Sequence, residues 1–335
     1  MRAPSFWWKP GSGALLSPLA GFYGAAAWLR LQRRGRGAGI PVICLGNLTV
    51  GGAGKTPAAL TVARFLLAAH RRPFFLSRGY GGRLAGPVTV NRNNHNAADV
   101  GDEPLLLARL APTIVARDRV AGAEAARFGG ASVIVMDDGF QNPSLQKDLS
   151  ILLVDNRRGI GNGRIIPAGP LRAPLEAQLA RAQALVTVGT SDGAAAVEQA
   201  ARRRRLPIFH GRIEPDQQTL AALIGRKVMA FAGIADPEKF FATLDEAGIV
   251  IAARREFPDH HQYTATEARD LLVRADAENL LLLTTEKDHV RLRGDRQLEA
   301  LAERTSALPV RLVIDEDEGF RQMLLTAAQR DTGGR

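Results

Sequence analysis

Cysteine is almost absent from this 335-residue sequence. Cys44 is the only one, so no disulfide can form within the chain. No Cys/His spacing of the zinc-binding type is present either. A disulfide framework is therefore excluded, and a reducing compartment is favoured. Neither an internal repeat nor a low-complexity tract is evident.

Long hydrophobic runs are scarce as well. Residues 13–31, GALLSPLAGFYGAAAWLRL, are nearly uncharged, but Pro18, Gly21 and Gly24 interrupt a run that barely reaches the length needed to cross a bilayer. A signal peptide starts with its basic residues, whereas here the basic cluster follows the apolar run. The sequence therefore predicts neither a spanning helix nor a cleaved leader.

We expect this segment to form a retained helix at the protein surface. It combines aromatic and arginine side chains, which is typical of helices that lie at an anionic membrane surface. A small-residue helix packed on the protein's own core is the alternative. The side chains concerned are Phe6, Trp7, Trp8, Phe22, Tyr23, Trp28, Arg30, Arg33, Arg34 and Arg36.

Negative charge is in deficit. The chain has 34 Asp and Glu against 44 Lys and Arg, a net charge of +10, which favours acidic partners such as nucleotides, nucleic acid or anionic lipid. Hydrophobic residues make up 46% and charged residues 23%, so most of the chain can bury a core. We expect the arginine run at 202–205 to be a solvated helix face.

The order of the apolar runs predicts an α/β fold with a doubly wound, mostly parallel sheet, because β-rich runs alternate with helical runs. We expect a membrane-contacting amphipathic helix in residues 1–36, a P-loop kinase domain in 37–215 and a smaller α/β domain in 225–330. The expected strands are 41–46, 73–77, 113–116, 132–137, 150–155 and 184–189, then 227–233, 248–253, 279–285 and 309–315. The expected helices are 56–70, 103–110, 237–247, 266–276 and 317–330.

Residues 46–57, GNLTVGGAGKTP, have the character of a phosphate-binding loop. In the pattern G-x-x-x-x-G-K-[ST], between a strand and a helix, backbone amides surround the phosphates while the Lys and the hydroxyl reach the terminal phosphate and Mg²⁺. Thr49 stands where the first glycine is expected, so the loop is a variant. The predicted nucleotide-binding residues are Thr49, Gly51, Gly52, Ala53, Gly54, Lys55 and Thr56.

A nucleotide site of this kind also needs an acidic residue at the end of a neighbouring strand to hold Mg²⁺. The run VIVMDDGFQ leads from four apolar residues into Asp137 and Asp138. These carboxylates should emerge at the same edge of the sheet as the P-loop. Together with Thr56, they are the predicted metal ligands.

Two other motifs carry candidate catalytic groups. VGDEP places Asp102 at an expected helix start, where a carboxylate is also a common capping group. FPDHHQY (257–263) contains one Asp and two His beside aromatic residues, a cluster that can ligate a metal or tune a general base. Spacing alone does not choose between these roles.

Taken together, the motifs resemble the tetraacyldisaccharide 4'-kinase family of lipid A biosynthesis. The resemblance implies transfer of the γ-phosphoryl group of ATP, with Mg²⁺, to the 4'-hydroxyl of an acylated glucosamine disaccharide 1-phosphate, giving lipid IVA. It also implies a location at the cytoplasmic face of the bacterial inner membrane. The motifs that carry it are GNLTVGGAGKTP, SRGYGG (77–82), VGDEP (100–104), MDDGFQN (136–142), PAGPLR (167–172), FPDHHQY and TTEKD (284–288).

The resemblance also implies roles for single residues. Lys55 would contact the ATP phosphates, and Asp102 matches the catalytic carboxylate that accepts the proton of the sugar hydroxyl. His260 matches its imidazole partner, with His261 as the alternative. Because Asp102 and His260 come from different parts of the chain, we expect closure of the two parts to assemble the pair.

Substrate contacts are implied by the same resemblance. One departure is Ala173, which stands where the family usually has an acidic residue after GPLR. Residue 173 of this chain therefore cannot take the role of that acid. The predicted phosphate- or sugar-binding residues are Arg78, Arg117, Gln141 and Arg172.

Two other functions fit part of the sequence. A P-loop regulatory or metallochaperone NTPase would use the same loop, but no guanine-reading N-K-x-D is recognisable, although TEKD (285–288) looks superficially like one. A basic nucleic-acid-binding protein without catalysis would also account for the positive charge, although nonspecific binding by such a chain proves little. We favour the lipid kinase and expect no specific nucleic-acid partner.

Overall fold

The computed structural model describes residues 3–52 and 54–329. The strands are β1 Val42–Asn47, β2 Pro73–Ser77, β3 Val88–Thr89, β4 Thr113–Val115, β5 Val133–Asp137, β6 Leu149–Asp155, β7 Ala184–Val188, β8 Ile208–Pro215, β9 Lys227–Ala232, β10 Val250–Glu256, β11 Leu281–Thr285, β12 Thr305–Leu308 and β13 Val310–Ile314. The α-helices are α1 Ser17–Gln32, α2 Lys55–Ala68, α3 Ala97–Val100, α4 Asp102–Leu107, α5 Arg119–Phe128, α6 Leu175–Leu179, α7 Ala195–Arg203, α8 Gln217–Ala221, α9 Pro237–Glu246, α10 Ala265–Ala277, α11 Glu286–Leu292, α12 Glu299–Arg304 and α13 Asp317–Ala328. Two short 3₁₀ helices, η1 Ser5–Trp8 and η2 Ala14–Leu16, precede α1.

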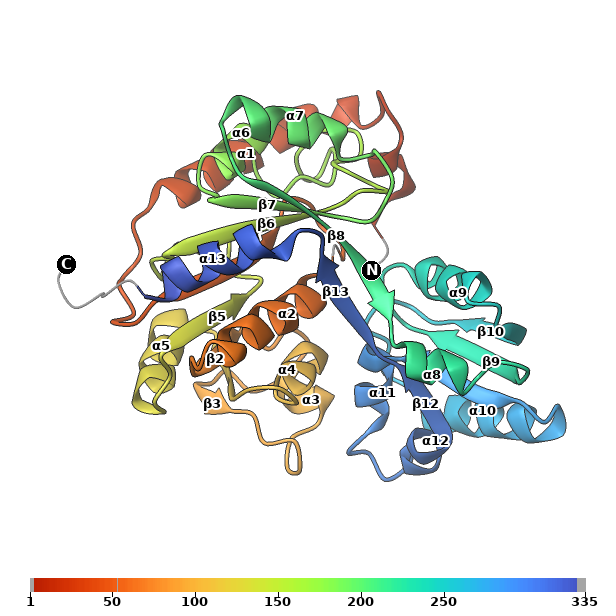
Figure 1. Cartoon of the computed structure of the whole chain (residues 1–335). Coiled ribbons are helices and arrows are strands. Elements are labelled where there is room, and N and C mark those ends of the chain that lie inside the picture. Colours follow the sequence, from red (N-terminus) through yellow and green to blue (C-terminus); the bar gives the residue numbers. More distant parts are fainter. Residues whose placement is uncertain (1–2, 53, 330–335) are drawn as a thin grey trace.

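Two β-sheets organise the molecule (Figure 1). The larger has nine strands in the order β13-β8-β7-β6-β1-β5-β2-β4-β3. Its neighbouring strands are parallel except for β13 and β3, which pair antiparallel at the two edges. The smaller sheet has four parallel strands in the order β10-β9-β11-β12. The predicted α/β class, with a mostly parallel sheet and a second, smaller sheet, is confirmed.

Helices cover both faces of the larger sheet because its central strands are apolar on both sides. In β1, Val42 and Cys44 belong to one buried cluster with side chains of α5, α6 and α7, whereas Ile43 and Leu45 belong to another with α2 and α13. Successive side chains of a strand point to opposite faces, so a continuous apolar run requires cover on both. This explains why the β1 run was recognisable as a central parallel strand.

The chain returns to the larger sheet at its C-terminal end. Strand β13 pairs with β8, and Thr61 in α2 donates a hydrogen bond of 2.8 Å to the Leu312 carbonyl. Helix α13 then packs on α2 and β1. The prediction that residues 309–315 form a strand of the second part is therefore wrong, and the smaller sheet ends with β12. Strands β3, β8 and β12 were not predicted, since β3 is two residues long and β8 mixes polar and apolar side chains.

Helix α1 packs on the protein through a stripe of small residues. Ala20, Gly24, Ala27 and Leu31 are buried, at helical spacings of four, three and four. A Cβ at Gly24 would lie 2.9 Å from the end of the Ile165 side chain, so glycine lets the helix approach Ile165 closely. Within residues 3–52 and 54–329, no helix is both long and apolar enough to pass through a bilayer.

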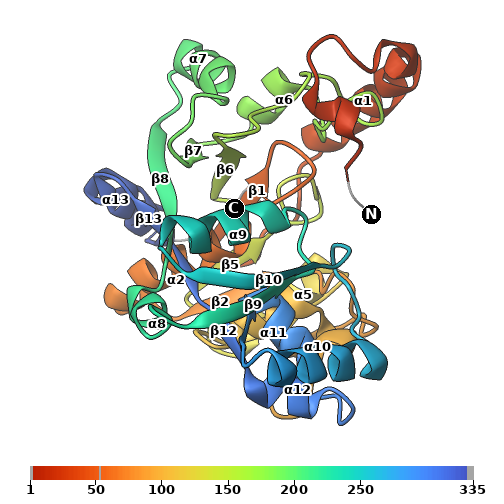
Figure 2. The same cartoon turned by 90° about the vertical axis from the view of Figure 1, so that its right-hand side faces the viewer.

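The opposite face of α1 stays exposed and apolar, so the helix is apolar on both faces rather than amphipathic. Phe22 is 79% and Leu29 59% exposed. Trp7, by contrast, is buried, and its indole donates a 3.0 Å hydrogen bond to the Pro167 carbonyl. Trp7 therefore belongs to the protein's own packing. In Figure 2, α1, α6 and α7 occupy one end of the molecule, away from the smaller sheet.

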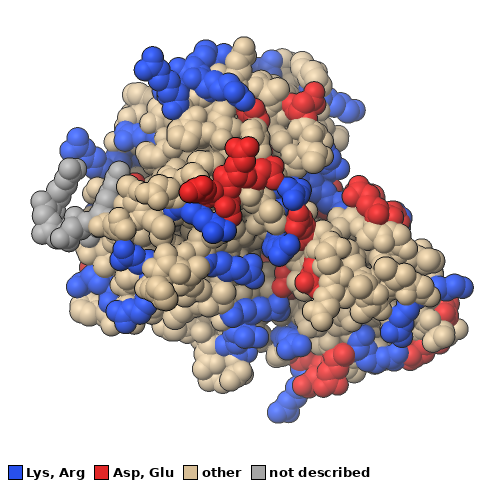
Figure 3. All heavy atoms as spheres, viewed as in Figure 1, with Lys and Arg blue, Asp and Glu red and all other residues tan. Residues whose placement is uncertain are grey.

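The arginine run at 202–205 is solvent-exposed, as predicted. Arg202 pairs with Glu198 one turn earlier, and Arg204 pairs with Glu176. Figure 3 shows basic side chains at the end of the molecule where α7 lies, with acidic side chains on other parts of the same face. The positive charge is therefore distributed, and this run is a solvated helix end.

Candidate active site

The loop after β1 has the strand–loop–helix context of a P-loop. Gly54 caps α2 with φ +80°, a left-handed conformation that glycine adopts without strain. Asn47 at the end of β1 donates a 2.8 Å hydrogen bond to the Gly51 carbonyl, and Arg172 donates one of 3.2 Å to the Thr49 carbonyl. Ala53, a predicted nucleotide contact, lies outside the described residues. The loop is thus held at its base while Gly52 is exposed.

Lys55 and Arg172 converge on one carboxylate. Lys55 Nζ lies 3.3 Å from Asp138 Oδ1, and Arg172 Nη1 lies 2.9 Å from the same oxygen. Burial acts to raise the pKa of Asp138, but the two cations outweigh it and hold that pKa below its usual value. Burial lowers the pKa of Lys55, against the pull of Asp138. Two cations therefore lie beside the P-loop, where they can bind a strongly anionic ligand.

Asp137 is a buried carboxylate without a full set of partners. It is 5% exposed at the end of β5, and in the described part of the chain its Oδ1 has no hydrogen-bond partner. Burial, with the nearby charge of Glu103, raises the pKa of Asp137 to about 6. A buried acceptor left unpaired costs free energy unless something binds it. This is the environment expected of a ligand for a cation.

The residues around Asp137 fit Mg²⁺ shared with phosphate oxygens. Thr56 and Asp138 lie at the same edge of the sheet, and Thr56 is buried. No group of three or more His, Cys, Asp or Glu side chains in the described ranges could hold a metal. Mg²⁺ commonly takes one or two carboxylates and completes its shell with substrate phosphates and water. The predicted ligand set is of that kind.

Asp137→Asn is expected to stabilise the ligand-free protein at pH 8. The folded pKa of about 6 lies above the ordinary value near 3.9. The favourable contribution of the neutral carboxyl is therefore present at low pH and lost as the pH rises through about 6. The loss amounts to roughly 3 kcal/mol at most, and removing it should raise Tm by roughly 2–6 °C. Thermal unfolding at pH 4 and pH 8 measures this, and a lower Tm at pH 8 would contradict it.

A second polar cluster surrounds Asp102 at the start of α4. Asp102 follows Gly101, whose φ of +88° sets the bend into the helix, and the side chain is 3% exposed. Its Oδ2 accepts a 2.9 Å hydrogen bond from Arg291 Nε and lies 3.4 Å from His260 Nδ1. Its Oδ1 accepts the Glu103 amide at 3.0 Å. The predicted pair of Asp102 and His260 is therefore together in this structure, and closure is not needed to bring them into contact.

The pKa values of the two members of the pair are shifted in opposite directions. Burial acts to raise the pKa of Asp102, but the hydrogen bond with His260 and the charge of Arg291 outweigh it and hold that pKa well below its usual value. The hydrogen bond to Asp102 raises the pKa of His260. Asp102 is therefore ionised at neutral pH, and His260 holds its proton more strongly than a free imidazole.

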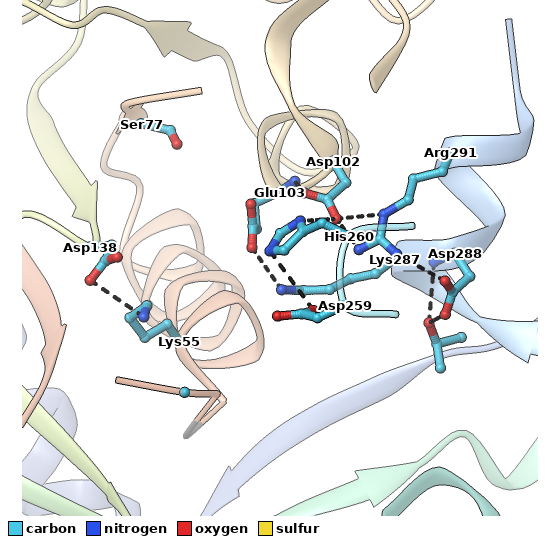
Figure 4. Close-up of polar contacts among 12 residues, drawn as sticks. Lys55, Ser77, Asp102, Glu103, Asp138, Asp259, His260, Lys287, Asp288 and Arg291 are labelled. Carbon is cyan, nitrogen blue, oxygen red and sulfur yellow. Dashed lines mark hydrogen bonds and ion pairs between the residues drawn. The ribbon is translucent and has the colours of Figure 1, made fainter. Parts of the chain in front are cut away.

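The Asp102 cluster and the P-loop belong to one site. Figure 4 shows Lys55 and Asp138 on one side and Asp102, His260 and Lys287 on the other. Lys287 on α11 pairs with Glu103 at 2.7 Å, and the charges of both act on Asp137. A phosphate donor at Lys55 and a hydroxyl beside His260 would thus share one polar space.

Two residues of the site have a left-handed backbone conformation. In the described ranges six non-glycine residues have positive φ, and two of these are Asp138, at +51°, and His260, at +56°. Such conformations are uncommon outside glycine and tend to persist at functional sites, where surrounding contacts impose them. Tyr80 from the SRGYGG segment packs edge-on against His260, with ring centroids 5.2 Å apart. Tyr80 and Asp102, both of the larger-sheet part, therefore contact the His260 ring.

The remaining predicted residues lie in three different surroundings. Gln141 donates a 3.0 Å hydrogen bond to the Asn47 carbonyl, so it supports the P-loop beside Arg172. Arg78 and Arg117 are exposed and directly follow the carboxyl-end region of β2 and β4, the edge where α/β ligands bind. His261, the alternative to His260, instead contacts Glu267 at 3.0 Å. Glu267 belongs to the capping box of α10, so His261 is bound there and not to Asp102.

Ala173 lies in the core. It is fully buried in the cluster beneath α6, and its carbonyl accepts a 2.8 Å hydrogen bond from Gln178. The side chains around Ala173 are apolar. None of these contacts replaces the acidic residue that the resemblance leads one to expect at this position.

Sequence reasoning missed Glu103, Lys287 and Arg291. A signal was present, because Lys287 and Arg291 are four residues apart and so share one face of α11. TEKD, which looks superficially like a guanine-reading motif, has a structural role: Asp288 is fully buried and accepts hydrogen bonds from Gly233, Tyr263 and Arg291. It is not available to read a base.

The strand–P-loop–helix unit, with an acidic strand end beside it, defines a nucleotide-binding α/β protein of the P-loop type. The family model "Tetraacyldisaccharide-1-P 4'-kinase" matches residues 12–329. The chain belongs to the tetraacyldisaccharide 4'-kinase family.

Individual relatives agree with the family match. The chain is 51% identical over 334 residues to a tetraacyldisaccharide 4'-kinase of Rhodopseudomonas palustris, covering 99% of this chain and 98% of the relative. It is 50% identical over 332 residues to one of Afipia carboxidovorans, covering 98% of each. The crystal structure of LpxK from Aquifex aeolicus in complex with ATP superposes with a TM-score of 0.72 at 27% identity, covering 94% of this chain and 99% of that one.

Proposed function

We infer that this protein is a tetraacyldisaccharide 4'-kinase. It transfers the γ-phosphoryl group of ATP to the 4'-hydroxyl of a tetraacyldisaccharide 1-phosphate, a lipid A precursor, and the product is lipid IVA. The observation that carries this inference is the buried, ionised Asp102, paired with His260 in the site that also contains Lys55 of the P-loop.

The P-loop residues would hold the nucleotide. Lys55 would neutralise the phosphates of ATP, and the amides of Gly51, Gly52 and Gly54 would surround them. Mg²⁺ held by Thr56, Asp137 and Asp138 would neutralise charge on the transferred group. Arg172, now bound to Asp138, supports this role because it can turn its guanidinium to a phosphate without leaving the site.

The Asp102–His260 pair would accept the proton of the sugar hydroxyl. The His260 side chain is 30% exposed whereas Asp102 is 3% exposed, so the hydroxyl meets the pair on the His260 side. Since the two groups are coupled, the proton belongs to the pair. In a loose transition state proton acceptance is late, and it contributes roughly 10²- to 10⁴-fold. Arg78 and Arg117 are proposed to bind the substrate phosphate.

The decisive experiment offers the purified protein ATP labelled in its γ-phosphate together with a tetraacyldisaccharide 1-phosphate in detergent. We expect label in the lipid, dependent on Mg²⁺ and on both substrates. Release of labelled inorganic phosphate at the same rate with and without lipid would instead support a regulatory NTPase.

We further propose that α1 holds the protein at the cytoplasmic face of the bacterial inner membrane. Its exposed apolar face ends at a basic patch that lines a cavity of about 570 Å³. Such a surface suits anionic lipid, because apolar burial and electrostatic attraction add. The basic residues that line the cavity are Arg30, Arg33, Arg34, Lys147 and Arg181.

Replacing the exposed residues Phe22, Trp28 and Leu29 by serine together is expected to weaken binding to vesicles of anionic phospholipid by tenfold or more, since each large apolar side chain contributes roughly 1.5–3 kcal/mol when buried. ATP affinity should stay within about twofold, because the buried stripe of α1 remains intact. Vesicle co-sedimentation measures the partition. Phe128→Ser, which alters an exposed side chain on α5, is the matched control. Unchanged partition of the triple variant would show that α1 is only structural.

A further inference from the structure

Arg291 is the most completely bound cation of the site. Its side chain is 2% exposed, although guanidinium groups are rarely buried. Nε and Nη2 both donate to Asp102 Oδ2, and Nη1 donates to the Gly233 carbonyl at 2.7 Å and to Asp288 Oδ1 at 2.9 Å. Arg291 belongs to α11, beside the smaller sheet, whereas Asp102 belongs to α4 of the larger-sheet part. Arg291 therefore holds Asp102 from across the contact between the two parts.

The guanidinium is itself fixed by Asp288. Asp288 Oδ1 also accepts the Gly233 amide and the Tyr263 hydroxyl, each at 2.9 Å, and Oδ2 accepts the Thr285 hydroxyl at 2.6 Å. Tyr263 is buried. Both oxygens of Asp288 are therefore engaged, and this restricts the position of the Arg291 guanidinium. Figure 4 shows this chain of bonds running from Asp288 through Arg291 to Asp102.

Docking of the two parts does not depend on Arg291 alone. Arg109 pairs with Glu286 at 3.0 Å, and Lys287 pairs with Glu103, across the same contact between α4 and α11. A third ion pair that is fully buried would stabilise this contact only weakly, because the desolvation of both charges offsets much of their attraction. The direct contact with Asp102 gives Arg291 a different use.

We propose that Arg291 is a positioning residue for the proposed phosphoryl transfer: it holds Asp102 toward His260 and limits how strongly the Asp102–His260 pair binds a proton. An unshared carboxylate would bind the His260 proton more tightly, because an adjacent cation disfavours protonation. The other charged groups that face the pair are Lys287 on α11, Glu103 on α4 and Asp259 beside His260. Sharing Asp102 with Arg291 keeps the pair able to accept a proton near neutral pH.

Two substitutions separate position from charge. Arg291→Lys keeps the charge but loses the forked geometry, so kcat should fall by roughly 10- to 100-fold. The acidic limb of its kcat/KM profile should stay in place. Arg291→Gln loses the charge, and both the acidic limb and the pKa of His260 should rise by about one pH unit. KM for ATP should change less than about twofold in both variants, because Arg291 bonds to Asp102, Gly233 and Asp288 and to none of the described P-loop residues.

Histidine NMR titration provides a readout that does not require kinase activity. The His260 signal is assigned by its loss in His260→Asn, and its pKa is compared between wild type and Arg291→Gln. Arg109→Gln is the matched control, because it removes an ion pair across the same contact without touching Asp102. It should leave the pKa of His260 and kcat unchanged. Tyr263→Phe, which loosens Asp288 only, should fold and lower kcat by about threefold.

The outcomes are distinct. A His260 pKa that is the same in wild type and Arg291→Gln, together with an unmoved acidic limb, overturns the proposal even if the kinase activity is established. If Arg291→Gln does not fold, Arg291→Lys and Tyr263→Phe decide: undiminished kcat in both overturns the proposal. If the wild-type protein phosphorylates no lipid, the proposed function fails. The NMR titration still tests the effect of Arg291 on the Asp102–His260 pair: an unchanged pKa of His260 in Arg291→Gln refutes it.

Discussion

Lys55→Ala is expected to lower kcat for lipid phosphorylation by on the order of 10³-fold. Phosphoryl transfer depends mainly on positioning and on neutralising charge, and Lys55 is the cation at the start of α2 beside the P-loop. Among the described residues, Lys55 forms a 3.3 Å ion pair with Asp138, and Asp138 stays bound to Arg172 when the Lys55 side chain is removed. The fold should therefore survive the substitution.

The measurement is single-turnover transfer of labelled phosphate, accompanied by thermal unfolding. Lys227→Ala, which removes an exposed lysine at the start of β9, is the control and should be fully active. If Lys55→Ala retains more than about a tenth of the wild-type rate, the loop around Gly54 is not the phosphate-binding element.

Asp102→Asn is expected to lower kcat by roughly 10²- to 10⁴-fold, because asparagine cannot accept a proton. The variant should also be less stable at neutral pH, since the buried Arg291 would lose one of its two anionic partners and keep only Asp288. The pKa of Asp102 is depressed in the fold, so its contribution to stability is present above the unfolded pKa near 3.9 and is lost as the pH falls through the folded pKa. The stability difference from wild type should therefore shrink only in strong acid.

Asp99→Asn supplies the matched control. Asp99 is also buried, lies three residues before Asp102 and pairs with Arg83, but it has no contact with His260. It should lose stability while keeping kcat within about threefold. Comparable loss of turnover in the two variants would mean that Asp102 acts only through the fold.

Periodicity predicted the strands that are buried on both faces. The β1, β5 and β6 runs are mostly apolar and buried, so their assignment needed no tertiary knowledge. Strand β13 was predicted to exist, but not to pair with β8. Its burial alternates, and a half-buried strand can pack on either of two sheets.

The site was predictable where its residues are adjacent in sequence. Glycines, Lys55 and the Asp137–Asp138 pair follow strands directly, and parallel strands bring their carboxyl ends to one edge. The partners of Asp102 were not predictable in this way. Arg291 is 189 positions away from Asp102, and nothing in its local sequence shows which carboxylate it meets. Trp7 was misplaced for the same reason, because its packing partner lies at Pro167.

By itself, the sequence determined the central strands, the position of the P-loop between β1 and α2, and the acidic strand end beside it. These features depend on continuous apolar runs and on neighbours along the chain, which any sequence displays directly. The tertiary structure alone decided that α11 would meet α4, that β13 would return to the larger sheet, and which face of α1 would remain exposed. Those outcomes depend on contacts between distant segments, where the choice among similar apolar faces is made by packing rather than by local pattern.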